Sequence, residues 1–155
     1  MEIRKYILED TELLMKLQIE TIKSINSSDY SSKEIEAWLS PENMNLDFFA
    51  KTLKENIVYV SLIDDKIVGF GELNKKGEIK RLYTNKNYQG KGVASRLLKV
   101  LEQEAKKMGL DYLILESTIS AKNFYESKGF IILGKKVENV NGVEHIGFDM
   151  KKKLI

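Results

Sequence analysis

The sequence contains no cysteine, one histidine and one proline among its 155 residues. Without cysteine the chain has no disulfide, no thiolate metal ligand and no cysteine nucleophile, and a single histidine argues against a zinc site. No stretch approaches the ~20 apolar residues that span a bilayer, and the N-terminus lacks the apolar core of a signal peptide. We therefore expect a cytoplasmic protein with no metal and no membrane partner.

Neither sign of charge dominates the sequence, since 25 basic residues face 23 acidic ones and the net charge is +2. Domains that bind nucleic acid usually carry a strong basic excess, so we expect no nucleic-acid partner. Apolar residues make up 43% and charged residues 31%, which is the balance of a globular protein. At this length the chain fits a single domain, residues 1–155, and it contains no repeat or linker.

Hydrophobic periodicity places helices mainly in the first third of the chain and strands mainly after it. The expected first strand covers residues 3–7, and Asp10 is the expected N-cap of a helix that extends to Ile25. Two short helices follow at residues 31–38 and 45–55, and then a three-strand meander at residues 57–63, 66–73 and 78–84. A long helix covers residues 93–108, and the next strand covers residues 111–115. A helix at 120–128 precedes two strands at 130–137 and 143–150. Asp64-Asp65 and Asn141-Gly142 are the expected hairpin turns, and the order predicts one α+β domain around a mixed sheet.

Residues 83–99, YTNKNYQGKGVASRLLK, place two glycines around a lysine between a strand and a long helix. Gly90 and Gly92 permit unusual backbone dihedrals, which is a purely structural explanation. The positive end of a helix also favours phosphate, and glycines let backbone amides approach its oxygens. The Walker pattern fails because Gly92 follows Lys91, and the dinucleotide fingerprint fails at Ser95. A structural turn and an anion-binding loop both remain open at this point.

Two motifs in the second half of the chain occur together. The pattern Gln/Arg-x-x-Gly-x-Gly/Ala is matched by Gln89, Gly92 and Ala94, and A-x-x-F-Y-x-x-x-G-F by Ala121, Phe124, Tyr125, Gly129 and Phe130. With these motifs, residues 78–129 strongly resemble the GNAT superfamily of acyl-CoA-dependent N-acetyltransferases. The resemblance implies an α+β fold with a mixed, mostly antiparallel sheet of about seven strands flanked by helices in three α/β/α layers. It also implies transfer of an acetyl group from acetyl-CoA to a primary amine by direct attack.

The resemblance further implies that the loop amides hold the pyrophosphate of coenzyme A and that the preceding strand pairs with its pantetheine arm. The implied cofactor-binding residues are Leu82, Tyr83, Thr84, Gln89, Gly90, Lys91, Gly92, Val93, Ala94, Ser95 and Phe124. An open strand edge offers donors and acceptors to the pantetheine amides, and one N–H there would stabilise a developing oxyanion. Thr118 stands where many members carry an asparagine that contacts pantetheine.

Tyr125 matches the position at which many members place a general acid for the departing thiolate. A reference tyrosine has a pKa of about 10 against about 8.5 for a thiol, so we expect its proton to move late. The acceptor amine must lose a proton, which a carboxylate accepts directly or through water. Glu78 matches an acidic position that is frequent in the family, and Glu72 and Glu116 are the alternatives.

Other residues belong to the expected acceptor side. Tyr30 and Trp38 lie in a region that shapes the acceptor pocket in the family, and core packing is an equal explanation for Trp38. His145 is expected on a strand at the acceptor-side edge rather than as a catalyst. The expected acceptor is a small-molecule or peptide amine, and a homodimer remains open. The alternative function is a non-catalytic acyl-CoA-binding sensor, against which Tyr125 argues.

Overall fold

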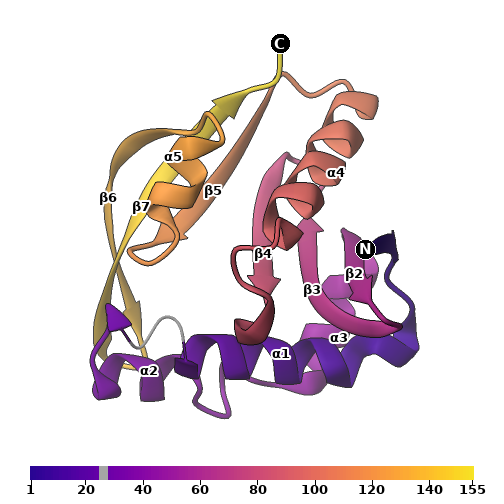
Figure 1. Cartoon of the computed structure of the whole chain (residues 1–155). Coiled ribbons are helices and arrows are strands. Elements are labelled where there is room, and N and C mark those ends of the chain that lie inside the picture. The colour runs from indigo at the N-terminus through magenta and orange to yellow at the C-terminus, as the bar shows by residue number, and fades with distance from the viewer. Residues whose placement is uncertain (25–27) are drawn as a thin grey trace.

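A seven-stranded sheet runs through the computed structural model, which describes residues 1–24 and 28–155 (Figure 1). The strand order is β1-β2-β3-β4-β5-β7-β6. The strands are β1 (Glu2–Lys5), β2 (Ile57–Ile63), β3 (Lys66–Leu73), β4 (Glu78–Thr84), β5 (Tyr112–Thr118), β6 (Ile131–Val140) and β7 (Val143–Lys153). The helices are α1 (Thr11–Ser24), α2 (Ser32–Trp38), α3 (Leu46–Glu55), α4 (Val93–Lys107) and α5 (Lys122–Ser127), with 3-10 helices η1 (Leu8–Asp10) and η3 (Lys86–Tyr88). Ile25, expected at the end of the first helix, lies outside the described residues.

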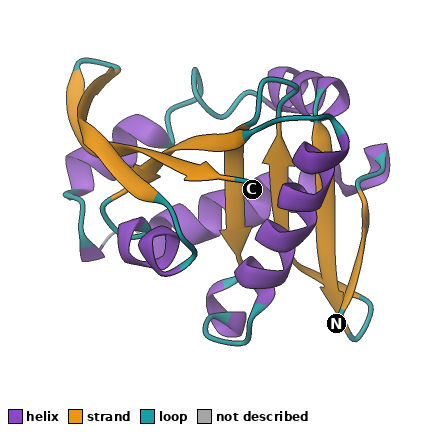
Figure 2. Cartoon of the chain, turned by 90° about the horizontal axis from the view of Figure 1, so that it is seen from above, coloured by secondary structure: helices purple, strands orange, loops and turns teal. Residues whose placement is uncertain are grey.

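Helices cover both faces of the sheet, as the view from above shows (Figure 2). On one face, Leu14 of α1 and Leu53 of α3 pack against Val60 and Phe70 of the sheet. On the other face, α4 and α5 enclose a larger apolar cluster to which β3, β4, β5 and β7 contribute. The predicted three-layer fold with a mostly antiparallel seven-stranded sheet is confirmed. None of the helices in the described ranges is long and apolar enough to cross a membrane.

Helix α4 packs closely on β3, because β3 presents glycines beneath it. A Cβ at Gly69 would lie 2.8 Å from Val93 Cγ1, and one at Gly71 would lie 2.9 Å from Leu101 Cδ1. A side chain at either position would clash with side chains of α4 and force its neighbours to shift. The two glycines therefore fix where the N-terminus of α4 lies beside the end of β4.

Both expected hairpin turns are present. Asp64 and Asp65 have φ values of 51° and 63°, and Asn141 has 50°, the left-handed region that two-residue turns require. The last strand extends further than expected, because residues 151–153 continue the pairing of β7 with the start of β5. The expected N-cap is wrong, since the carboxylate of Asp10 accepts hydrogen bonds from Arg4 and the Ile7 N–H instead.

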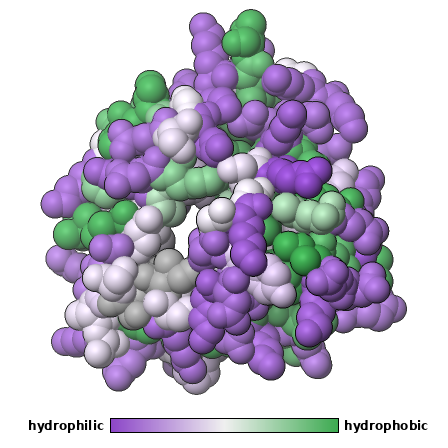
Figure 3. All heavy atoms as spheres, viewed as in Figure 1, coloured by the Kyte–Doolittle hydropathy of each residue, from purple (hydrophilic) through white to green (hydrophobic). Residues whose placement is uncertain are grey.

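The sheet opens between β4 and β5, which form the one parallel pair among the strands of residues 1–24 and 28–155. β4 and β5 pair at Glu78 with Ile114 and at Ile79 with Leu115, and at no further position. Beyond Ile79, β4 stays with β3 while β5 stays with β7, so the two strands diverge (Figure 1). The space-filling view shows the molecule hollowed between these halves (Figure 3). This divergence places side chains from both halves around one opening.

Candidate active site

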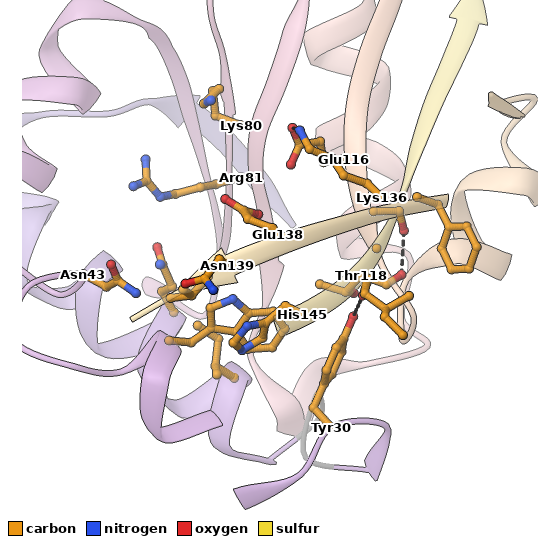
Figure 4. Close-up of a pocket in the computed structure, with 18 of the residues that line it drawn as sticks. Tyr30, Asn43, Lys80, Arg81, Glu116, Thr118, Lys136, Glu138, Asn139 and His145 are labelled. Atoms are coloured by element: carbon orange, nitrogen blue, oxygen red, sulfur yellow. Dashed lines mark hydrogen bonds and ion pairs between the residues drawn. The ribbon is translucent and has the colours of Figure 1, made fainter. Parts of the chain in front are cut away.

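Two cavities meet where β4 and β5 diverge. The first, here called the α5 cleft, has a volume of about 220 Å³ and is enclosed by β4, β5, α5 and the glycine loop. The second, here called the β6 cavity, has a volume of about 560 Å³ and reaches from α1 and α2 to β6 and β7 (Figure 4). Both share the wall residues Lys80, Arg81, Tyr83, Glu116, Ser117 and Thr118. A molecule in one cavity can therefore touch a molecule in the other.

The α5 cleft collects most of the residues that the sequence assigned to a cofactor. Its wall contains Leu82, Tyr83, Thr84, Gln89, Ala94, Phe124 and Tyr125. The other predicted residues lie in the loop and the first turn of α4 rather than on the cleft wall: Gly90, Lys91, Gly92, Val93 and Ser95. Residues between Leu82 and Tyr125 thus converge, because the loop and α5 approach the open edge of β4.

The glycine loop ends in an uncapped helix terminus. Gly90 and Gly92 have φ values of 75° and 81°, and no heavy atom lies within 4 Å of a Cβ built on either. Gly92 is the N-cap of α4, and no side chain in the described part of the chain caps the first amides. The bond from Arg96 N to Gly92 O begins the hydrogen bonding of the helix, so the amides before Arg96 have no partner within it. Free N–H groups at the positive end of a 15-residue helix form a site for a phosphate.

Gln89 stabilises the loop from within. Its Nε2 donates to the backbone oxygen of Thr84 at 2.9 Å, and the Thr21 hydroxyl donates to the same oxygen at 3.3 Å. These two bonds tie the loop and α1 to the end of β4. Lys91 is exposed, and its Nζ lies 5.3 Å from the centre of the Tyr88 ring. The glutamine of the motif thus positions the loop, and the lysine remains available to an anion.

Two buried hydroxyl oxygens in the α5 cleft have no hydrogen-bond partner in the described part of the chain. They are Thr84 Oγ1 and Ser120 Oγ. A buried polar group that lacks a partner costs about 1–3 kcal/mol, so such groups are usually satisfied by a ligand or water. The amides of a pantetheine arm would supply those partners. The cleft, its orphaned hydroxyls and the uncapped helix together fit coenzyme A.

Tyr125 is held on α5 with its ring enclosed by aromatic neighbours. The ring centres of Phe124 and Phe130 lie 5.3 Å and 5.5 Å away, both edge-on. The hydroxyl has no hydrogen-bond partner among residues 1–24 and 28–155. Burial, with a smaller contribution from Tyr83, raises the pKa of Tyr125 well above the ordinary value for a tyrosine. Tyr125 therefore remains a hydrogen-bond donor throughout the neutral range.

The three predicted carboxylates occupy very different places. Glu78 lies at the paired end of β4, outside both cavities, where it accepts a hydrogen bond from Asn74 Nδ2 at 3.2 Å. Glu72 is fully buried and is bonded to Asn56 and Arg81. Glu116 lines both cavities and forms an ion pair with Lys136. The structure thus brings Glu116 together with Tyr125 at the cleft wall, and it does not bring Glu78 there.

An aromatic cluster forms the floor of the β6 cavity. The Trp38 ring lies 4.6 Å from Tyr30 and 4.4 Å from His145, centre to centre. The Tyr30 hydroxyl donates to Ile146 O, and a ring nitrogen of His145 lies 2.7 Å from Glu34 O. Figure 4 shows Tyr30 and His145 on this floor. These bonds fix the cluster in place, so it shapes the cavity and exposes no free imidazole base.

Several lining residues have no counterpart in the sequence analysis. Gln18 lines the β6 cavity, as do Glu138 and Asn139 of β6. Gln18 and Thr21 are polar residues on the buried stripe of α1, and this pattern is the signal that could have identified them. The β6 residues carry no motif. No cluster of three or more acidic or histidine side chains suited to a metal occurs in the described ranges.

Comparison with known proteins agrees with this geometry. The family model of the acetyltransferase (GNAT) domain matches residues 26–154. Spermidine N(1)-acetyltransferase of Thermoplasma acidophilum is 30% identical, over 98% of this chain and 96% of its own length. The crystal structure of the PaiA N-acetyltransferase of the same organism, in complex with coenzyme A, is 29% identical, covers 98% of both chains and superposes with a TM-score of 0.79.

A further structure shows the same fold at lower identity. A GCN5-related N-acetyltransferase from Rhodopseudomonas palustris superposes with a TM-score of 0.93 at 24% identity, over 98% of this chain and 94% of that one. Its similarity concerns the fold, whereas the family model matches residues 26–154 and the relative at 30% identity covers 98% of this chain. The chain therefore belongs to the GNAT family and is an N-acetyltransferase that uses acetyl-CoA.

Proposed function

We propose that this enzyme acetylates the primary amine of a small molecule or peptide held in the β6 cavity. Acetyl-CoA supplies the acetyl thioester: the amine nitrogen bonds to the acyl carbon, the carbon–sulfur bond breaks, and coenzyme A leaves as the thiol. The observation that carries the proposal is the shared wall of the two cavities, which holds Glu116 beside a cleft lined by Tyr125. Glu116 is suited to receive the amine proton, and Tyr125 is suited to stabilise the thiolate.

For the cofactor, we assign the loop amides between Gly90 and Ser95 to the pyrophosphate and the open edge of β4 to the pantetheine arm. The uncapped first turn of α4 supports the first assignment. The limited pairing of β4 with β5 and the unpartnered hydroxyls of Thr84 and Ser120 support the second. Val93 is the exception in the loop, because its side chain is buried in the core and only its backbone can serve.

Tyr125 acts as the hydrogen-bond donor to the departing thiolate. With ordinary values of about 10 and 8.5, full proton transfer from a tyrosine to a thiolate is uphill by roughly 2 kcal/mol. Burial makes this transfer still less favourable, because it raises the pKa of Tyr125. The tyrosine therefore stabilises the thiolate by a short-range hydrogen bond, and the proton moves late in the reaction.

Glu116 is the group that receives the amine proton, either directly or through a water molecule. An alkylamine with a pKa of ~10.4 costs roughly 4–5 kcal/mol to deprotonate at neutral pH, so a carboxylate beside it is needed. Lys136 forms an ion pair with this carboxylate and holds it at the wall. Glu78 lacks comparable support, because it lies outside both cavities.

The acceptor belongs to the class of small amines. A relative with 30% identity over nearly the full chain is named for spermidine, which supports small-molecule amines of this kind as acceptors. The cavity volume of about 560 Å³ also leaves room for a substituent around the reacting nitrogen. Lining side chains of both charges, Lys80 and Arg81 opposite Glu116 and Glu138, permit polar groups on that substituent (Figure 4).

Two substitutions test the assigned roles. Tyr125→Phe is expected to lower kcat by about 10²-fold, the lower end of general acid–base effects, with little change in the KM for acetyl-CoA. Glu116→Gln is expected to lower kcat/KM for the amine at pH 7 and to recover as the pH rises, because more of the amine is then neutral. Tyr112→Phe and Glu126→Gln alter exposed residues outside both cavities and serve as controls. Unchanged kcat in Tyr125→Phe would refute its role.

A further inference from the structure

Gln18 is a buried polar residue on the wall of the β6 cavity with no assigned task. Its side chain belongs to α1, and the residue is only 7% exposed. Its Oε1 has no hydrogen-bond partner in the parts of the chain that the structure describes. An unpartnered amide inside a protein destabilises the fold, and an unbranched apolar side chain of the same length would avoid this cost. The glutamine at this position is therefore better explained by contact with a ligand than by a contribution to the stability of the fold.

Gln18 lies in the β6 cavity, one helical turn from a residue of the α5 cleft. It lines the β6 cavity, while Thr21, three residues further along the same buried face of α1, lines the α5 cleft. Residues three apart on a helix are neighbours on its surface. Tyr83 lines both cavities and packs against the apolar clusters to which α1 contributes Leu17 and Ile22. We therefore place the Gln18 amide near the point at which an acceptor in the β6 cavity would meet the acetyl group in the α5 cleft.

The chemistry of the acceptor supplies the missing partner. A neutral primary amine has one lone pair, which forms the new bond to carbon, and two N–H groups. One of these protons leaves to the base, and the other remains on nitrogen in the amide product. Glu116 is assigned to the first, and that assignment leaves the second N–H without an assigned protein acceptor.

We propose that Gln18 Oε1 accepts a hydrogen bond from the N–H that the acceptor retains, and that it thereby selects primary over secondary amines. The inference rests on the proposed function. A secondary amine has a single N–H, which must go to the base, so it leaves the Gln18 oxygen without a donor. Gln18 is therefore a specificity-determining residue that also orients the nitrogen lone pair toward the acyl carbon.

The test compares a primary amine acceptor with its N-methyl counterpart. In wild type, kcat/KM should favour the primary amine, and in Gln18→Met this ratio should fall about five- to tenfold, the value of one hydrogen bond. Gln18→Glu keeps acceptor oxygens at the site and should retain the preference. Gln103→Met, on the exposed side of α4, is the matched control and should leave the ratio unchanged.

Thermal denaturation and titration with coenzyme A separate this role from a structural one. Because the substitution removes an unpartnered amide, Gln18→Met should unfold at the same or a higher temperature and should bind coenzyme A as wild type does. The inference would be overturned if Gln18→Met kept the wild-type ratio of kcat/KM for the primary over the N-methyl amine, or if folded Gln18→Glu lost the preference. Either result would leave the proposed function intact. A wild-type enzyme that acetylates no amine would overturn the proposed function, and this inference with it.

Discussion

Substitution of Gly92 by alanine separates a loop built for a cofactor from a simple structural turn. Gly92 adopts φ 81° and ψ 9°, and an added Cβ would meet no heavy atom within 4 Å. The cost of the alanine is therefore the left-handed backbone alone, about 1–2 kcal/mol. Because the loop faces open space, the variant can relax to another conformation when it is free and must return to the strained one to hold a phosphate.

The expected signature is a loss of affinity for coenzyme A. At 1.4 kcal/mol per tenfold change, 1–2 kcal/mol corresponds to a rise in Kd of roughly 5- to 30-fold. The part of the strain that the free loop cannot relax appears instead as a lower free energy of unfolding. Isothermal titration with coenzyme A measures the first quantity, and urea denaturation of the free protein measures the second.

Two other glycines provide matched controls. Gly109, at the opposite end of α4, has φ 76° and equally open surroundings, so Gly109→Ala should lower stability without changing the affinity for coenzyme A. Gly134 in β6 has open surroundings and no positive φ, so Gly134→Ala should change neither quantity. If Gly92→Ala loses stability as Gly109→Ala does but keeps its affinity, the loop is a structural turn and the assignment to the pyrophosphate is wrong.

Three further outcomes follow from buried or partly buried groups. Arg81→Met leaves the fully buried carboxylate of Glu72 without its charged partner. The free energy of unfolding, measured in urea, should therefore fall by about 3–5 kcal/mol. A fall of less than about 1 kcal/mol would contradict the pairing. Burial tends to raise the pKa of Asp10, but hydrogen bonds from Arg4 and a backbone N–H outweigh it, and the pKa is lowered. The ionised carboxylate therefore stabilises the fold above about pH 4, and this stabilisation is lost as the pH falls. Asp10→Asn should lower the melting temperature at pH 7 and lower it much less at pH 3. Burial raises the pKa of Tyr125, so its hydroxyl should keep its proton at pH 10, and kcat should not fall there through ionisation of this residue. A fall in kcat at pH 10 that is present in wild type and absent from Tyr125→Phe would refute the burial of the hydroxyl.

Features with a local physical cause could be predicted from the sequence. Asn141-Gly142 tolerates the positive φ that a two-residue hairpin needs, and the structure places the β6–β7 turn there. Gly92 opens the first turn of α4 for the same kind of reason. The family motifs add Tyr125, whose position on α5 follows from its spacing to Phe124. Each of these depends on a few neighbouring residues.

The acceptor side could not be predicted in this way, because distant segments build it. Gln18 and His145 line the same cavity but are separated by most of the chain. The position of Glu78 depends on strand register, and the pairing of β3 with β4 shifts by one residue between Glu72 and Leu73. Such an irregularity exchanges the two faces of a strand, and no residue type announces it.

Acetyl transfer from acetyl-CoA to a panel of primary amines, followed by thiol release and by the mass of the amine product, tests the central claim most directly. The account predicts that at least one small primary amine gains one acetyl group for each thiol released. Tyr125→Phe should slow that transfer while still binding coenzyme A. Tight binding of acetyl-CoA by wild type without acetylation of any amine would contradict the account and would indicate a sensor of acyl-CoA.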